Sequence, residues 1–140
     1  MDRRENTGRV IGDATLDRYL AAILSLGRQR AIVRSVDVAN HLGYSKACVC
    51  VAVKQMINEA LVRVERHGAL VLSEDGERRA RAQLERCDYF RGLLLDSGVE
   101  AKAARQEADA ITRVLSGRSY EALRRYLGSL GVPSSQTDMK

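Results

Sequence analysis

The sequence predicts a mostly helical protein that begins with a winged helix-turn-helix domain and ends in a small all-helical domain. Three observations predict this class. Apolar residues recur at three- and four-residue spacing along most of the chain, which is typical of amphipathic helices. A single proline stands against 11 glycines. Two short apolar runs flank Arg66, His67 and Gly68, and such a pair of runs around a short turn indicates a β-hairpin.

Composition limits the possible functions. A chain of 140 residues has room for one domain or two small subdomains. No stretch reaches the roughly 20 apolar residues of a membrane span, and the charged start MDRRENTGRV lacks the apolar run of a signal peptide. We therefore expect a cytoplasmic protein without a membrane partner. The net charge is +5, and residues 1–72 carry 11 Lys and Arg against 7 Asp and Glu, which favours a polyanionic partner.

The first part of the chain predicts three helices after a flexible arm at residues 1–13. One helix is expected over residues 13–27. Ser35 is expected to cap a short second helix that ends near Gly43, and Ser45 is expected to cap a third. The buried stripe of this third helix is predicted to consist of five residues: Val49, Val53, Met56, Ile57 and Ala60.

The rest of the chain predicts a hairpin and three more helices. The hairpin strands are expected at Leu61–Glu65 and Ala69–Ser73. Acidic residues follow Ser73, and such residues are favoured in the first turn of a helix. Helices are then expected at 74–95, 100–115 and 119–127. The predicted organisation is a winged helix-turn-helix domain over 14–73, a linking helix over 74–97, a helical dimerisation domain over 98–128 and a disordered tail over 129–140.

The segment Ser35–Val53 fits a helix-turn-helix, a motif that places its second helix in the major groove of DNA. Ala39 is small enough for close helix packing, Gly43 permits a left-handed turn, and Val49 fills the point where the helices cross. We therefore expect double-stranded DNA as the partner. The residues expected at the DNA lie at the helix starts, on the outer face of the second helix and at the hairpin tip: Ser35, Ser45, Lys46, Ala47, Cys50, Val51, Lys54, Arg66 and His67.

These side chains suit DNA in two ways. The two lysines fit phosphates or guanine edges, and Arg66 and His67 fit phosphates or the minor groove. Small side chains on the same helix face could contact thymine methyl groups, namely Ala47, Cys50 and Val51. That apolar face leaves a second interpretation open, in which the winged helix is a protein-interaction module. The sequence contains no G-x-S-x-G, P-loop or H-E-x-x-H motif, so we expect no enzyme activity.

The three cysteines do not suffice for a disulfide framework. Cys48 and Cys50 point about 200° apart on a helix, so they cannot bond to each other without unfolding it. Cys48 is expected to border the core and Cys50 to face outward. A thiol-based, redox-responsive regulator that uses Cys50 therefore stays open as an alternative.

Four stretches of the chain resemble the iron- and manganese-dependent repressors, the diphtheria-toxin-repressor and manganese-transport-regulator (DtxR/MntR-like) family. They are LDRYLAAILSL, VRSVDVANHLGYSKACVCVAVKQM, LVRVERHGALVLSEDGERRA and EADAITRVLS, and the resemblance extends over roughly residues 15–127 without needing gaps. The resemblance implies a repressor that pairs through its C-terminal helices as a homodimer and binds a palindromic operator. The apolar residues of segment 100–127 agree with such pairing, because so short a domain cannot hide them alone.

The metal-ligand positions of the family depart from its pattern in this chain. By resemblance they fall on six residues, of which only the cysteine and the aspartate keep ligand chemistry: Arg18, Ala21, Cys87, Asp109, Thr112 and Arg113. A divalent Mn, Fe or Zn ion needs more oxygen or imidazole donors than these. We therefore expect no cofactor, and either metal-independent or altered effector control. Our hypothesis is that Arg18 or Arg113 pairs with Asp109 in place of the metal; the alternative is a site that has simply decayed.

Overall fold

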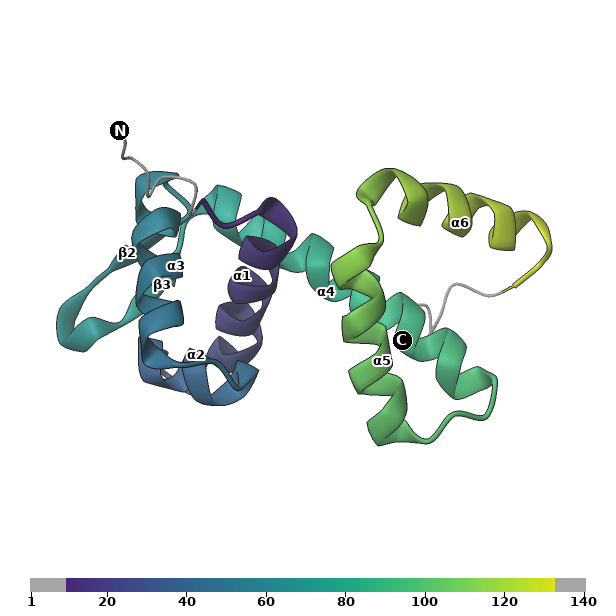
Figure 1. The fold of residues 1–140 in the computed structure, drawn as a ribbon, viewed down its shortest axis with the longest axis horizontal. Helices are drawn as coiled ribbons and strands as arrows, with labels where there is room; N and C mark the ends of the chain where they lie inside the picture. Colours follow the sequence, from purple (N-terminus) through teal and green to yellow (C-terminus); the bar gives the residue numbers. More distant parts are fainter. Residues whose placement is uncertain (1–9, 133–140) are drawn as a thin grey trace. The chain divides into compact units, whose positions relative to one another are not determined.

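The computed structural model describes residues 10–132, which form two compact units, 10–81 and 82–132 (Figure 1). The mostly helical class expected from the sequence is confirmed, and helix α4 (Glu74–Asp96) contributes residues to both units. The arm expected at 1–13 and the tail expected at 129–140 fall largely outside the described residues. The remaining domain limits stay a prediction.

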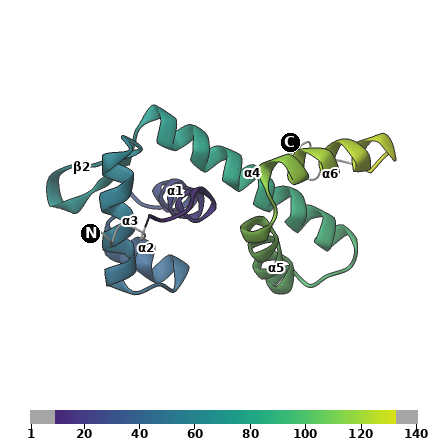
Figure 2. The same ribbon diagram turned by 45° about the horizontal axis from the view of Figure 1, so that its top comes forward.

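Three helices form the body of the first unit, and they pack around one apolar core (Figure 2). They are α1 (Asp13–Gly27), α2 (Ser35–Leu42) and α3 (Lys46–Asn58). α1 has the limits that its apolar spacing predicts. The largest fully buried side chains come from all three helices: Leu16, Leu20, Met56, Val38 and Val49. This shared core holds α2 and α3 in one arrangement.

The start of α2 differs from the prediction. Ser35 is the first residue of the helix and not its cap, because Arg34 occupies the N-cap position with an extended backbone. The Asp37 carboxylate accepts a hydrogen bond from the backbone N–H of Arg34 at 2.8 Å and one from the Arg30 guanidinium at 2.8 Å. The N–H of Arg34 is thus satisfied by Asp37, a residue inside the helix. The preference for serine at N-caps predicts the opposite arrangement, in which the capping side chain is the acceptor.

The buried stripe of α3 also differs from the prediction. Its buried residues are Val49, Ala52, Val53 and Met56. Ile57 is 43% exposed, because at about 100° per residue it lies some 80° from Val49 around the helix. Ala60 is exposed and follows the end of the helix, with a backbone φ of 60°. The stripe is therefore narrower and centred closer to Met56 than the apolar pattern indicates.

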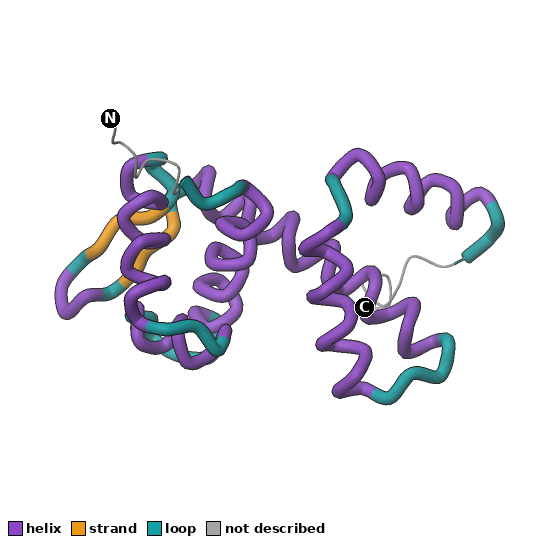
Figure 3. The backbone as a smooth tube through the Cα atoms, in the orientation of Figure 1, coloured by secondary structure: helices purple, strands orange, loops and turns teal. Residues whose placement is uncertain are grey.

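An antiparallel hairpin forms the wing of the first unit, and it carries the only strands within residues 10–132 (Figure 3). Strands β2 (Val62–Val64) and β3 (Leu70–Leu72) pair with Val62 opposite Leu72, and the helical turn η2 (Arg66–Gly68) joins them. Each strand is one residue shorter at either end than expected. The wing extends away from the three helices in Figures 1 and 2.

The wing leads directly into α4. The Ser73 hydroxyl accepts from the Gly76 N–H at 3.0 Å and donates to the Ala60 carbonyl at 2.8 Å. Gly76 is required here because a Cβ at this position would lie 2.1 Å from the carbonyl oxygen of Leu61. The first turn of α4 is therefore locked against the segment that joins α3 to the wing.

The second unit consists of the remainder of α4 with α5 (Ala101–Val114) and α6 (Gly117–Ser129). Its core is small and aromatic: Tyr89 and Tyr120 pack edge to face with ring centroids 5.8 Å apart, and Phe90 completes the cluster. The Arg124 guanidinium donates to the Tyr120 hydroxyl at 2.8 Å. No helix within residues 10–132 has the length and apolar character to cross a membrane.

Candidate nucleic-acid interface

The helix-turn-helix is formed by α2, α3 and the three residues between them. Gly43 adopts the left-handed conformation, with φ of 74°, and its N–H donates to the Ala39 carbonyl at 2.8 Å. This conformation favours glycine and explains why the turn ends α2 at this position. The Ser45 hydroxyl then accepts from the Cys48 N–H at 3.1 Å, so the cap expected for α3 is confirmed.

The outer face of α3 is open to solvent. The structure exposes all the residues of this helix that the sequence assigns to DNA contact: Lys46, Ala47, Cys50, Val51 and Lys54. Val51 is 50% exposed, which is unusual for a β-branched apolar side chain. Cys48 is exposed as well, so the expectation that it borders the core is wrong. It lies about 100° from Val49 around the helix, outside the buried stripe.

Hydrogen bonds from the segment that precedes α2 hold the wing. Arg66 and His67 are exposed, and His67 has a left-handed backbone with φ of 61°. The Arg34 Nε–H donates to the His67 carbonyl at 2.6 Å, and the Leu70 N–H donates to the Val33 carbonyl at 2.8 Å. The segment that enters α2 therefore fastens the wing at its tip and at its second strand.

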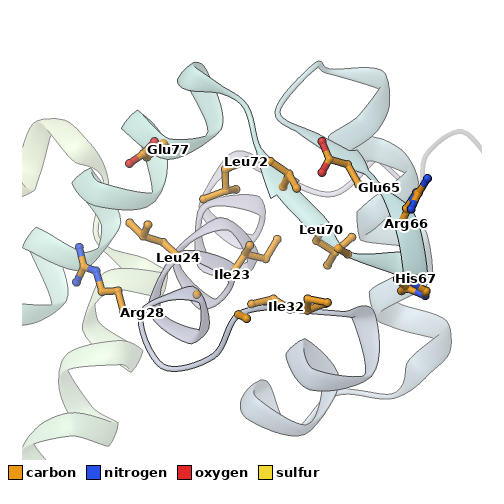
Figure 4. Close-up of a pocket in the computed structure, with 15 residues that line it drawn as sticks. Ile23, Leu24, Arg28, Ile32, Glu65, Arg66, His67, Leu70, Leu72 and Glu77 are labelled. Atoms are coloured by element: carbon orange, nitrogen blue, oxygen red, sulfur yellow. The ribbon is translucent and has the colours of Figure 1, made fainter.

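A groove of about 830 Å³ opens between α1, the segment 31–33 and the wing (Figure 4). Its wall is mainly apolar, with Ile23, Ile32 and Leu70 in the middle. Arg28 and Glu77 lie at one end, and Arg66 and His67 lie at the other (Figure 4). The inner side of the wing is therefore uncovered, and the tip side chains are not packed against the helices.

Three cations are exposed on α3 and at the wing tip. Lys46, Lys54 and Arg66 have no ion-pair partner within residues 10–132, and Arg28 at the end of α1 has none there either. Several other cations of the unit are paired: Arg30 pairs with Asp37 at 2.8 Å, and Arg79 pairs with Asp17 at 2.7 Å. Phosphates could neutralise the three cations of α3 and the wing tip.

The resemblance places two metal-ligand positions of the family on Arg18 and Ala21 of α1, and neither side chain is of a type that ligates a divalent metal. Ala21 is buried, and Arg18 is only 8% exposed. The Arg18 guanidinium donates to the Tyr44 hydroxyl, and its Cζ lies 5.5 Å from the centroid of the Tyr44 ring. Burial raises the pKa of the neighbouring Tyr19, and repulsion from Tyr44 and Cys48 raises it further, whereas Arg18 lowers it.

In the second unit, two of the positions expected from the resemblance, Cys87 and Thr112, form a hydrogen-bonded group with Gln83. The Gln83 amide donates to the Thr112 hydroxyl at 3.1 Å and points to Cys87 Sγ at 3.7 Å. The Thr112 hydroxyl in turn donates to the Asp109 carbonyl at 2.8 Å. Gln83 and Thr112 are 3% and 2% exposed, and Arg113 is exposed. We call Gln83, Cys87 and Thr112 the polar cluster.

This donor set does not fit a hard divalent cation. The amide N–H of Gln83 is directed at the oxygen of Thr112 that a metal would need, and the hydroxyl proton of Thr112 is already donated. No group of three or more His, Cys, Asp or Glu side chains capable of holding a metal occurs in the described part of the chain. Hard cations bind several carboxylate or carbonyl oxygens, and the polar cluster contains no carboxylate.

Comparison with known proteins relates this chain to regulators. No protein-family model matches it. The transcriptional regulator MntR of Escherichia coli O157:H7 is 28% identical over 109 residues, which cover 78% of this chain and 70% of that protein. MntR of Salmonella typhimurium is 26% identical over 107 residues, which cover 76% of this chain and 68% of that protein. The chain is thus similar to MntR over about three quarters of its length. The resemblance that the sequence indicates is thereby confirmed.

Solved structures show the same fold as this chain. A manganese-dependent transcriptional repressor in complex with manganese superposes with a TM-score of 0.71 at 23% identity, covering 84% of this chain and 53% of that one. The manganese regulator SloR gives 0.68 at 20% identity, covering 84% and 54%. IdeR of T. acidophilum gives 0.68 at 19% identity, covering 91% and 57%. This chain thus spans about half the length of these structures.

Sequence reasoning missed Arg34, Tyr44 and Gln83. Arg34 and Tyr44 reach partners 33 and 26 residues away, and no local pattern indicates such contacts. Gln83 had a detectable signal, because it precedes Cys87 by four residues and therefore lies on the same helix face.

Proposed function

We propose that this chain is a DNA-binding transcriptional repressor whose α3 enters the major groove while the wing contacts the flanking backbone. The observation that carries this proposal is the charge pattern: Lys46, Lys54 and Arg66 lack ion-pair partners within residues 10–132 and lie on the two elements that a winged helix presents to DNA. The relatives named above are regulators, which supports a role in transcription rather than in catalysis.

The test is the salt dependence of binding to a fluorescently labelled duplex of mixed sequence. Lys46→Ala and Lys54→Ala should each weaken binding. Each should also make the fall of log affinity with log salt less steep, by about 0.9 in slope for one lost phosphate contact. Arg66→Ala should act in the same direction more weakly. Lys102→Ala is the matched control, because this exposed lysine lies on α5. Unchanged slopes for both α3 variants would show that α3 does not contact DNA.

We further propose that the chain works as a homodimer on a palindromic operator. The second unit leaves large apolar side chains open to solvent: Val114 at 85%, Leu123 at 38%, Tyr126 at 61% and Leu130 at 61% exposure. Exposed apolar surface of this kind marks an association face. Light scattering should give the mass of a dimer, and Tyr126→Ser with Leu130→Ser should shift it to a monomer. Ile57→Ser, on an exposed apolar residue of the first unit, should leave the mass unchanged; a monomeric wild type contradicts the proposal.

Metal-independent control is the third part of the proposal, although two neighbouring structures are described with manganese and with zinc. The polar cluster supports it, because its hydrogen bonds use the groups that a cation would need. The melting temperature of the wild type should be the same with and without EDTA. Asp109→Ala should lower stability and DNA affinity equally in both conditions. If EDTA lowers the melting temperature of the wild type but not that of Asp109→Ala, the protein has a working ion site and this part of the proposal is wrong.

Two alternatives share the exposed face of α3. A protein-interaction module would use the apolar side chains of Ala47, Cys50 and Val51, and its DNA affinity would be low and insensitive to the lysine variants. A thiol-based regulator would use Cys50, which is exposed. In that case hydrogen peroxide should abolish duplex binding by the wild type, while Cys50→Ser should be resistant.

A further inference from the structure

A buried guanidinium on α1 is the feature that the proposed function leaves unexplained. Arg18 is 8% exposed and lies between the core residues Leu16 and Tyr19 in sequence. A buried cation is costly unless hydrogen bonds and charges compensate for lost hydration. The contacts to Tyr44 described above supply a hydrogen-bond acceptor and an aromatic ring, and cations bind favourably at such rings.

Tyr44 occupies a decisive place in the helix-turn-helix. It lies between Gly43, which ends α2, and Ser45, which caps α3. Its N–H donates to the Ala39 carbonyl at 3.1 Å, and its ring meets the Tyr19 ring edge to face with centroids 5.6 Å apart. The backbone of Tyr44 is therefore held by α2 and its side chain by α1, one residue before the cap of α3.

We infer that Arg18 is a positioning residue for DNA recognition, which acts through Tyr44 to set where α3 begins relative to α1. This inference rests on the proposed function. Because a guanidinium keeps its charge throughout the physiological pH range, the contact needs neither a metal nor a proton to form. Arg18 stands where the family resemblance puts a metal ligand, so an intramolecular contact would hold the recognition helix ready without an effector.

The inference predicts that affinity depends on the Arg18–Tyr44 pair as a unit. Tyr44→Phe removes only the hydroxyl, and Arg18→Met removes the guanidinium, with its charge and hydrogen-bond donors, while keeping an unbranched apolar side chain. Each should weaken binding to the mixed-sequence duplex, by about tenfold for Arg18→Met, because the hydrogen bond to the Tyr44 hydroxyl is lost. The double variant should be no weaker than Arg18→Met alone, because both changes break the same contact. Arg18→Lys should restore part of the affinity.

A local readout separates positioning from general stability. Hydrogen exchange at the Cys48 N–H, which Ser45 caps, should become faster in Arg18→Met under conditions where the variant remains folded. Arg79→Met is the matched control: it removes a cation that pairs with Asp17 on α1, so it should lower the melting temperature and leave duplex affinity unchanged.

Three outcomes overturn the inference: additive losses in the double variant, unchanged affinity in folded Arg18→Met, or equal losses in Arg79→Met. Failure of the proposed function is recognised separately. In that case the wild type shows no salt-dependent duplex binding and the α3 lysine variants have no effect, whatever happens at Arg18.

Discussion

The two units of the molecule are built around different cores. The first unit hides a large aliphatic core and leaves cations unpaired on α3 and at the wing tip. The second unit has a small aromatic core beside buried Gln83 and Thr112, and it leaves Val114 and Tyr126 open to solvent. Since unsatisfied surface indicates a partner, the first unit suits a polyanion and the second an apolar face.

The largest expected effect is a loss of stability when the aliphatic core of the first unit is disrupted. Met56→Ala empties a fully buried position and should cost about 2–5 kcal/mol in the free energy of unfolding. Ile57→Ala, one residue away but 43% exposed, should cost about 0.5 kcal/mol or less. Urea denaturation followed by circular dichroism measures both. Equal losses would mean that the buried stripe of α3 is as broad as its apolar pattern indicates.

The next effect concerns the polar cluster in the second unit. Gln83→Met removes the donor to Thr112 and should destabilise the protein by about 1–3 kcal/mol, because the buried hydroxyl loses this donor and keeps only its bond to the Asp109 carbonyl and its contact with Cys87. Gln106→Met, on an exposed residue of α5, is the control and should be nearly neutral. A variant more stable than wild type would show that an apolar core is preferable here, and that the cluster is retained for another reason.

A smaller effect compares equivalent helix caps in the two units. The Ser45 and Ser116 hydroxyls each accept from a backbone N–H three residues on, at 3.1 and 3.0 Å. Replacement of either by alanine should cost about 1 kcal/mol. Only Ser45→Ala should also weaken duplex binding, because only α3 is proposed to enter the groove. Thermal melting and the duplex assay together check this, and a parallel loss of affinity in Ser116→Ala would contradict the division of roles.

The smallest effect is the alkaline dependence of stability. Burial raises the pKa of Tyr120, and the Arg124 guanidinium opposes the shift; burial also raises the pKa of Tyr19. A raised folded-state pKa means that the stabilising contribution is fully present below the unfolded pKa of about 10 and is lost as pH rises through the folded value. Tyr120→Phe should therefore flatten the stability curve above pH 10. Tyr126→Phe, at a residue that is 61% exposed, should leave it unchanged.

Much of the first unit could be predicted from local sequence. The limits of α1, the left-handed Gly43, the Ser45 cap and the hairpin all follow from residues that are neighbours in the chain. The candidate DNA surface was predictable for the same reason, since exposure on a helix depends on spacing around its axis. Where spacing alone was ambiguous, as for Cys48 and Ile57 beside the stripe, the expectation was wrong.

The sequence by itself determined the helical class and the winged helix-turn-helix, because residue type and short-range periodicity suffice for these. Only the tertiary structure decided the partners of the buried polar side chains. Arg18 meets Tyr44 across 26 residues, and Gln83 meets Thr112 across 29. Such contacts depend on how the helices pack against one another. Packing brings side chains together by complementary shape and by the need to satisfy buried hydrogen-bonding groups, and neither can be read from residues that are neighbours in the chain.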